Sequence, residues 1–490
     1  MPLPRLQLNS DSSEPMYLQL CAGLVTAIEN GTLAAGMRLP AERDYAETLG
    51  VSRTTVASAY RELVDRGLLR PHVGRGTFVC AVPEAEQAPF AWRGKISTRV
   101  QRVANPALRH LITRGNDPRL ISFAAGFPAI DLFPTKEFRR LTDHVLARSA
   151  SAIARLAPTE GQPGLRAAIA AHFKVRLEQV MIVSGATEGL SLIADCLIDK
   201  GDAVIMDRPG YVGAIQIFRA AGADLHGWDI RNADPGELED LIIRYRPKFI
   251  QINPTFQNPT GHTLPERDRR SLLGLAARYR VPVIENDSYR DGYFEREPPK
   301  SLYQLDGGRL VLYLSTFSKV LGPGLRLGWI IANEYMIDQL ALVKERTNLF
   351  TQSLGQLVMT EFIRSGAYDR HAELVRKEHG RRCDAFFESM HRHLRSQISL
   401  APKPSGGIYA WGRLPGGYKS ADLLDRAINA GVAFGTGEIF YPDESGSEQL
   451  RFCFANLLPE QIEEGVKRLT KCFMGQQTTR PVAGKKLPLV

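Results

Sequence analysis

Short apolar runs, each followed at once by small or polar residues, recur along residues 119–475 of this 490-residue chain. Between the runs, apolar residues recur at helical spacing. This alternation predicts an α/β domain in which helices cover both faces of a mainly parallel sheet. Because the carboxyl ends of parallel strands meet at one edge, the residues that follow the runs are expected to share a ligand site. The runs are Val180–Val183, Ala203–Met206, Phe249–Ile252, Val281–Ile284 and Leu310–Leu314.

The stretch Ser315–Trp329 follows the last of these runs and contains Lys319. A lysine between small hydroxyl residues and a Gly-Pro-Gly loop can be poorly solvated, which lowers its pKa and lets the amine form a Schiff base with an aldehyde. Thr316, Ser318 and Arg326 can then bind a phosphate. A lone lysine of this kind is most often a solvated loop residue, so the interpretation depends on the other strand ends.

The other strand ends carry groups that suit one planar cofactor. A small-residue turn before a helix offers backbone N–H groups to a phosphate, an aromatic side chain can stack on a ring, and polar side chains can bond its oxygen and nitrogen. The residues are Gly185, Ala186 and Thr187 for the phosphate, Tyr211 for stacking, Asn258 and Tyr289 for a phenolic oxygen, and Asp287 for a pyridinium nitrogen. Each has an ordinary alternative, such as a helix start, a core aromatic or a turn former. Together with Lys319 they predict a socket for pyridoxal 5′-phosphate.

Residues 119–475 resemble fold type I, class I aminotransferases over almost their whole length. The resemblance rests on the segments F-A-A-G-F-P, S-G-A-T-E-G, Q-N-P-T-G, D-S-Y, S-K with an arginine seven residues on, and L-R-F-C-F-A-N. It implies that Arg451 binds the carboxylate of an amino acid, for which a structural salt bridge is the ordinary alternative, and that the backbone N–H of Gly126 reaches the same carboxylate. In two departures, Leu156 stands near the usual place of a tyrosine that contacts the phosphate across a dimer, and Ser315 replaces a frequent glycine.

Residues 13–80 have the pattern of a small domain with three helices and a hairpin. The expected helices span about Met16–Glu29, begin with Pro40 at the first helical position and stop at Gly50, and begin after the N-cap Ser52. Strands are expected at Leu68–Pro71 and Thr77–Val79, around a Gly-Arg-Gly tip. This order predicts a winged helix-turn-helix that contacts DNA.

The segments L-P-A-E-R-D-Y-A-E-T-L-G-V-S-R-T-T-V and V-G-R-G-T-F-V resemble the winged-helix domain of GntR-type bacterial regulators. The resemblance implies contacts with DNA from Arg43, Ser52, Arg53, Thr54, Thr55, Gly74 and Arg75. Ordinary surface charge is the alternative for the arginines. The eight arginines of residues 1–80 are balanced by eight acidic residues, so affinity must depend on where few charges lie.

Residues 81–118 are expected to be a linker, with a short helix near Pro106–Thr113 and with Phe90 and Trp92 as surface anchors. A winged helix joined through a linker to an aminotransferase-like domain resembles the MocR/GabR group of bacterial transcription regulators. The resemblance implies a head-to-tail homodimer that binds double-stranded promoter DNA and senses a small amino compound through pyridoxal phosphate on Lys319. Two alternatives stay open: an active pyridoxal-phosphate-dependent aminotransferase, and a regulator that senses pyridoxal phosphate itself.

Composition narrows the remaining classes. The six cysteines lie far apart without a C-x-x-C pair, so neither a disulfide framework nor a metal site is expected. The first residues lack the apolar stretch of a signal peptide and no run reaches membrane-spanning length, so we expect a cytoplasmic protein that binds no membrane. Residues 476–490 contain basic but no acidic side chains, and we expect a disordered tail.

Overall fold

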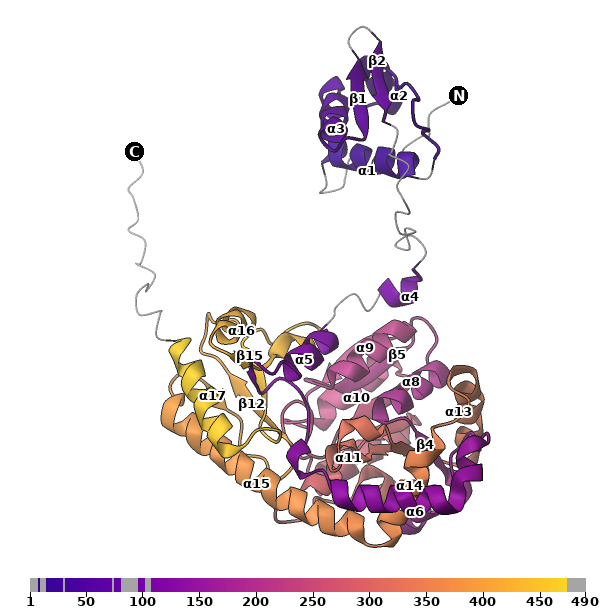
Figure 1. Ribbon diagram of the computed structural model, residues 1–490, viewed down its shortest axis with the longest axis vertical. Coiled ribbons are helices and arrows are strands. Elements are labelled where there is room, and N and C mark those ends of the chain that lie inside the picture. Colours follow the sequence, from indigo (N-terminus) through magenta and orange to yellow (C-terminus); the bar gives the residue numbers. More distant parts are fainter. Residues whose placement is uncertain are drawn as a thin grey trace. The chain divides into compact units, whose positions relative to one another are not determined.

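The computed structural model describes residue 8 and residues 15–29, 31–72, 75–80, 96–101 and 107–473 (Figure 1). The chain divides into two compact units, Met1–Ile96 and Ser97–Val490. The predicted wing residue Gly74, the predicted anchors Phe90 and Trp92 and the predicted tail 476–490 lie outside the described residues. Among those described, no helix is both long and apolar enough to span a membrane.

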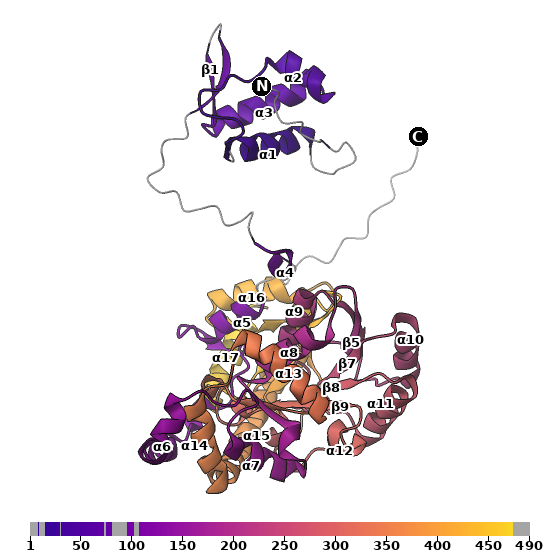
Figure 2. The ribbon, with the colours of Figure 1, turned by 90° about the vertical axis from the view of Figure 1, so that its right-hand side faces the viewer.

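The first unit has three helices and one hairpin within its described part (Figure 2). Leu24, Val56 and Leu63 are fully buried among the helices, so the apolar stripes read from the sequence meet in one small core. The predicted elements are confirmed, and their ends agree with the prediction within two residues. They are α1 (Met16–Glu29), α2 (Glu42–Leu49), α3 (Arg53–Asp65), β1 (Leu69–His72) and β2 (Gly76–Val79).

Local signals position the turn between α2 and α3. Gly50 has a left-handed φ of 66° after α2, a conformation that costs glycine nothing. The Ser52 hydroxyl accepts the N–H of Thr55 at 3.1 Å, which confirms the predicted N-cap of α3. The two caps therefore fix the direction in which α3 leaves the turn.

The predicted place of Pro40 is wrong. Helix α2 begins at Glu42, because the first helical hydrogen bond runs from the N–H of Tyr45 to the carbonyl of Ala41. The carbonyl of Pro40 instead accepts the hydroxyl of Tyr60 at 3.1 Å, which holds the proline in the preceding extended segment.

The second unit contains a seven-stranded sheet within its described part, and it is mainly parallel as predicted. Only β10 runs antiparallel to its neighbours, β9 and β4. In sheet order the strands are β4 (Val180–Val183), β10 (Gly328–Ile331), β9 (Val311–Thr316), β8 (Val283–Asn286), β7 (Phe249–Ile252), β5 (Ala203–Asp207) and β6 (Asp224–Trp228). The carboxyl ends of β9, β8, β7 and β5 thus lie along one edge.

Helices cover both faces of this sheet, which confirms the α/β prediction. One face packs against α6 (Thr135–Ala154), α7 (Pro163–Phe173), α10 (Pro235–Tyr245), α11 (Glu266–Tyr279), α12 (Leu302–Asp306) and α14 (Ser353–Arg364). The other packs against α8 (Ala186–Leu197), α9 (Val212–Ala221) and α13 (Glu334–Thr347).

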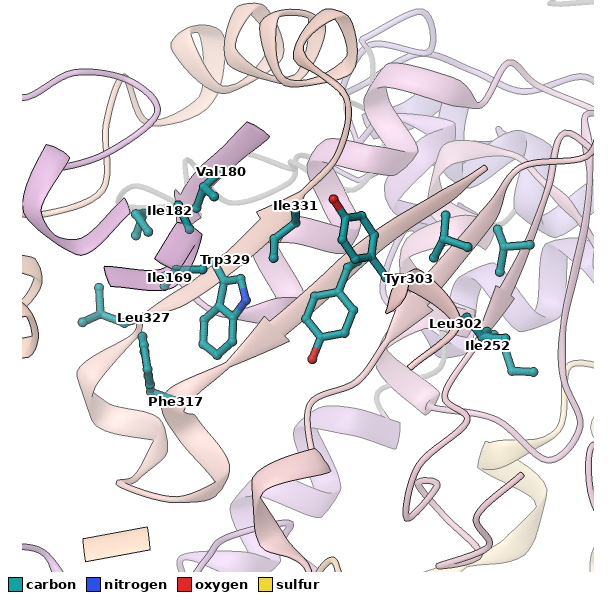
Figure 3. Packing of buried hydrophobic residues seen from close by; sticks show 14 of the residues in the cluster. Ile169, Val180, Ile182, Ile252, Leu302, Tyr303, Phe317, Leu327, Trp329 and Ile331 are labelled. Atoms are coloured by element: carbon teal, nitrogen blue, oxygen red, sulfur yellow. The ribbon is translucent and has the colours of Figure 1, made fainter. Parts of the chain in front are cut away.

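The core of the first face extends to the loop that holds Lys319 (Figure 3). The rings of Phe317 and Trp329 lie 4.6 Å apart between centroids, and Leu327 packs in the same cluster. Phe317 begins the short 3₁₀ turn η5 (Phe317–Lys319) that follows β9. Apolar packing therefore holds the backbone of this loop, so the Cα atom from which the Lys319 side chain extends is held in place.

The described part of the second unit also contains a smaller sheet and three further helices. The strands are β11 (Ser399–Leu400), β12 (Tyr409–Arg413), β15 (Gln449–Cys453) and β14 (Gly435–Thr436), and β13 (Val432–Ala433) pairs separately with β3 (Ile121–Ser122). The helices are α15 (Ala367–His393), α16 (Ser420–Asn429) and α17 (Pro459–Lys471). In the register of β12 and β15, Trp411 lies opposite Arg451.

The described part of the predicted linker belongs to the second unit from Ser97 on. It contains α4 (Thr98–Gln101) and α5 (Ala107–Gly115), and α5 confirms the short helix predicted near Pro106–Thr113. Leu111 of α5 is buried with Trp411 and Phe440. This contact ties the start of the second unit to its smaller sheet.

Candidate functional site

A pocket of about 210 Å³ lies where the strand ends of the large sheet meet β12, β15 and α5. Its walls come from segments that are far apart in the sequence, as the predicted topology requires. The predicted site residues that line it are Gly126, Ala186, Thr187, Tyr211, Asn258, Tyr289, Thr316, Ser318, Lys319, Arg326 and Arg451. Gly185 lies directly before this wall as the N-cap of α8, whereas Asp287 does not line the pocket.

Lys319 enters the pocket from η5. Its Nζ donates to the carbonyl of Gly126 at 3.0 Å and lies 5.5 Å from the ring centroid of Tyr289. Burial, together with the positive charges of Arg451 and Arg326, lowers the pKa of Lys319 to about 8. About a tenth of this amine is therefore neutral at pH 7, far more than for an ordinary lysine, and the neutral amine is the form that attacks an aldehyde.

One end of the pocket is built to receive an anion. The N-terminus of α8 presents first-turn N–H groups that have no acceptor within the helix. Beside it lie the hydroxyls of Thr316 and Ser318, 2.9 Å apart, and the guanidinium of Arg326, which donates to the carbonyl of Ser184 at 2.6 Å. At Gly185, with φ of 91°, an added Cβ would lie 3.0 Å from that guanidinium, so a side chain would narrow the cradle.

A chain of polar side chains crosses the middle of the pocket. Asn258 Nδ2 donates to the Tyr289 hydroxyl at 3.3 Å, which in turn donates to the Tyr409 hydroxyl at 3.3 Å. Burial raises the pKa of Tyr289 well above its ordinary value and the pKa of Tyr409 to about 12. Both phenols therefore keep their protons and can donate to an oxygen of a ligand.

Arg451 is a buried cation without a carboxylate partner among the described residues. Its Nη1 donates to Asn258 Oδ1 at 3.0 Å, and its Nη2 donates to the carbonyl of Ala124. The guanidinium carbon lies 4.4 Å from the ring centroid of Tyr409 and 4.7 Å from that of Phe440, while Nε has no hydrogen-bond partner. A buried positive charge held in this way favours an anionic ligand. Arg451 therefore does not form the structural salt bridge that was its ordinary alternative, within the described part of the chain.

Asp287 does not lie where the sequence analysis put it. Its carboxylate is on the opposite face of the sheet from the pocket, where Oδ2 is 3.4 Å from both the Tyr313 hydroxyl and Arg290 Nη1. The side chain that lines the pocket at this strand end is Asn286. The reason is the alternation of side chains along a strand: the final residue of β8 points to the pocket side, and the next residue points away.

The N-terminal end of α3 presents the predicted DNA-contacting side chains to solvent. Arg43 in α2, Ser52, Arg53, Thr54 and Arg75 are exposed, and Thr55 is half-buried. The Arg53 side chain is 73% exposed and lies 3.5 Å from a Glu42 carboxylate oxygen. An ion pair this exposed is weak, so a phosphate can readily take the place of the carboxylate. These exposed positions are compatible with the predicted contacts along a duplex.

The comparisons with known proteins agree with this architecture. Residues 118–469 match the model of the family described as aminotransferase class I and II. The chain belongs to this family. Its N-terminal residues 16–79 in addition match the family of bacterial regulatory proteins called gntR.

Relatives of this aminotransferase-family chain are of two kinds. The 2-aminoadipate transaminase of Thermus thermophilus is 33% identical over 392 residues, which cover 79% of this chain and 98% of the relative. The probable rhizopine catabolism regulatory protein MocR of Rhizobium meliloti is 29% identical and matches 97% of both chains. The structure of LysN, an α-aminoadipate aminotransferase from Thermus thermophilus complexed with N-(5′-phosphopyridoxyl)-L-leucine, has a TM-score of 0.75 at 32% identity and covers 79% of this chain and 98% of its own.

Pyridoxal phosphate is the cofactor that this family membership and these structures indicate. Most of the pocket fits it: a partly neutral lysine for the aldehyde, an anion cradle for the phosphate, and two protonated phenols near the middle. Tyr211, at the start of α9, lines the pocket where an aromatic ring can stack on the cofactor. The ring nitrogen is the exception, because no carboxylate among the described residues lines the pocket.

Several lining residues escaped the sequence analysis. Among them are Leu111, Ile112, Asn253, Asn286, Ser288 and Tyr409. The alternation in I-Y-A-W-G could have marked Tyr409 as one face of a strand, but only its pairing with β15 puts it beside Arg451. Leu111 and Ile112 lay in the predicted linker, where no pattern links them to a pocket that is lined mainly by residues between Ala186 and Arg451.

Proposed function

We propose that this chain is a bacterial transcription regulator that acts in the cytoplasm. It binds promoter DNA through α3 and the β1–β2 wing, and it senses an amino compound in a pocket where Lys319 carries pyridoxal phosphate. The GntR-type domain, the aminotransferase-type domain and the full-length match to a MocR regulator support this proposal.

One observation carries the sensing role: α5 lines the pocket. Leu111 and Ile112 lie near the start of the second unit, and they border the same cavity as Lys319 and Arg451. An occupant of the pocket therefore contacts the very segment that leads to the DNA-binding unit. For such a contact to switch the protein from mostly off to mostly on, the ligand must favour one state by about 5.5 kcal/mol.

The pocket residues divide the work of recognition. Pyridoxal phosphate, when bound, supplies an aldehyde carbon that can bond to an amine. Lys319 provides the resident amine, and the Gly126 carbonyl 3.0 Å away accepts a hydrogen bond from that amine when it is free. The guanidinium of Arg451 receives the carboxylate of an amino acid, while the Tyr289 phenol donates to the cofactor oxygen.

A homodimer is part of the proposal. An apolar groove beside the pocket is lined by Phe127, Ile130, Phe133, Leu321 and Leu325, and Ile130 is 56% exposed. Such a surface suits a second copy of the chain, arranged head to tail as in the resemblance described above. Leu156, 80% exposed, does not line the pocket of its own copy. Two copies would present two winged helices to paired half-sites on DNA.

The decisive experiment measures DNA binding by the holoprotein. Fluorescence anisotropy with the DNA immediately upstream of the coding region is recorded with and without a panel of amino compounds. At least one compound is expected to change the dissociation constant tenfold or more, and the Lys319→Ala variant is expected to lose this response while still binding DNA. A response that persists in Lys319→Ala, or DNA binding that no compound changes, contradicts the proposal.

The alternative is an active aminotransferase, which the name of the 2-aminoadipate transaminase relative favours. Here an amino acid would convert the cofactor to its amine form and an oxo acid would regenerate the aldehyde. Steady oxo-acid-dependent turnover supports this alternative. A third function, sensing of pyridoxal phosphate itself, requires DNA affinity to change with cofactor alone.

A further inference from the structure

We propose that the ring nitrogen of pyridoxal phosphate faces the neutral amide of Asn286, and that the pocket is thereby a receptor that binds amines without transaminating them. This inference rests on the proposed function, because it concerns the same cofactor and the same pocket. The identity of one residue, Asn286, would then favour a sensor over an active aminotransferase.

The first support is the direction of side chains at the end of β8. Ile284 packs into the core beneath α8 and α9, on the side where those two helices begin at the pocket. Glu285 faces the other way and accepts the backbone N–H groups of Leu302 and Tyr303 at 2.8 Å each. By alternation, Asn286 faces the pocket and the carboxylate of Asp287 faces the far side.

The second support is the state of the asparagine amides in the pocket. Asn253 is fully engaged, since its Oδ1 accepts the N–H of Asn258 at 2.9 Å and its Nδ2 donates to the carbonyl of Asn286 at 2.8 Å. Asn258 is shared between Tyr289 and Arg451.

Asn286 differs from both. Its Oδ1 accepts the Ser288 hydroxyl at 2.6 Å, and no described residue accepts a hydrogen bond from its Nδ2. The free group is therefore an N–H donor, which suits an unprotonated ring nitrogen that accepts a hydrogen bond.

The third support is the charge of the pocket wall. Lys319, Arg326 and Arg451 line it, but no described aspartate or glutamate does. Two buried acids at neighbouring strand ends do not line it: Asp287 Oδ2 lies 3.4 Å from the Tyr313 hydroxyl, and Asp207 Oδ2 accepts from Gln257 Nε2 at 2.7 Å. A protonated, positively charged ring nitrogen would thus lie among cations without a counter-ion, which is unfavourable in a buried site.

The chemical consequence follows from what the ring must do in each role. Exchange of one amine for another at the aldehyde carbon requires a neutral amine, which Lys319 and the ligand supply. Transamination in addition removes a proton from the ligand carbon, and the positive ring nitrogen held by a carboxylate is what takes up that electron pair. An amide cannot supply the charge, so the ligand stays bound and is not consumed.

The test uses holoprotein loaded with pyridoxal phosphate that carries ¹⁵N in its ring. In the native protein, the ¹⁵N chemical shift is expected at the position of an unprotonated pyridine. Asn286→Asp is expected to move it to the position of a pyridinium and to bind the cofactor about tenfold more tightly, since a charge-assisted bond replaces a neutral one. Asp287→Asn is the matched control and is expected to leave the ring shift unchanged.

Two outcomes overturn the inference. One is a pyridinium shift in the native protein; the other is a ring shift that responds to Asp287→Asn and not to Asn286→Asp. The ¹⁵N spectrum of the native protein alone shows whether the ring nitrogen is protonated, so the inference can be overturned even if a variant fails to fold. If the ring is unprotonated but no amino compound changes DNA binding, the regulator proposal fails while the assignment of Asn286 stands.

Discussion

The two units use arginine in opposite ways. Arg53 in the first unit is exposed, lies at the start of one helix and has an acidic neighbour, whereas Arg451 in the second is 3% exposed and has no acidic partner among the described residues. The first arrangement suits reversible contacts with a phosphate backbone, and the second suits one defined anion in a buried position. The difference teaches that the proposed DNA-binding surface is a local structure, while the pocket exists only through assembly of distant segments.

The largest effect is expected from a comparison of two lysines inside the pocket unit. Burial lowers the pKa of Lys344 to about 8, as for Lys319, but Lys344 Nζ donates to the carbonyls of Thr159 and Ile182 and does not line the pocket. Borohydride reduces a Schiff base to a stable amine, so treatment of the holoprotein is expected to leave a phosphopyridoxyl tag on Lys319 only. Lys319→Ala is expected to lose the tag entirely. Peptide mass spectrometry reads the result, and a tag on Lys344 would show that a lowered pKa alone, rather than position, selects the lysine.

A large effect is also expected when Arg451 is replaced by alanine. Loss of a charge-assisted pair with the ligand carboxylate is expected to weaken binding of the amino compound about 10- to 100-fold. Cofactor binding should change little, because Lys319 and the phosphate cradle remain. Titration followed by visible absorbance measures both. Arg451→Lys keeps the charge but not the two-pronged geometry, so it should recover only part of the affinity; equal loss of cofactor and ligand would make the arginine structural.

Uptake of pyridoxal phosphate by the cofactor-free protein is expected to depend on pH. Because only the neutral amine reacts and the pKa of Lys319 is lowered to about 8, uptake should speed up as pH rises through that value. The neutral fraction rises from about a tenth at pH 7 to about nine tenths at pH 9. Stopped-flow absorbance measures the rate, and a midpoint near the ordinary lysine value would mean that the pocket does not desolvate the amine.

The smallest effect is expected in the first unit. Arg53→Ala should weaken DNA binding several-fold and reduce the slope of log affinity against log salt by about 0.9, the contribution of one phosphate contact. Arg66, which pairs with Glu62 at the other end of α3, provides a control of equal charge. Arg66→Ala should leave the slope closer to that of the native protein. Equal salt slopes for the two variants would mean that DNA binding depends on the total charge of α3 and not on the end of the helix at which the arginine lies.

Much of the local structure could be predicted from the sequence. The cap at Ser52, the stop at Gly50 and the runs that became β4, β5, β7, β8 and β9 depend on neighbouring residues, and the predictions agree with the structure within two residues. Lys319 was singled out in the same way, because a polar cluster after a buried run marks a strand end, and the side chain lines the pocket.

The errors arose where distant contacts decide. Pro40 stays outside α2 because its carbonyl meets Tyr60, twenty residues later. Tyr409 and α5 reach the pocket only through packing of the smaller sheet against the larger one. Asp287 was chosen by its chemistry, but its direction depends on which residue ends β8.

The sequence by itself determined the two units, the elements within them and the lysine proposed to bind the cofactor, because caps, turns and periodicity act over a few residues. Only the tertiary structure decided what surrounds that lysine. Side chains one residue apart in a strand face opposite sides of a sheet, so the choice between the amide of Asn286 and the carboxylate of Asp287 was made by the placement of β8 among its neighbours.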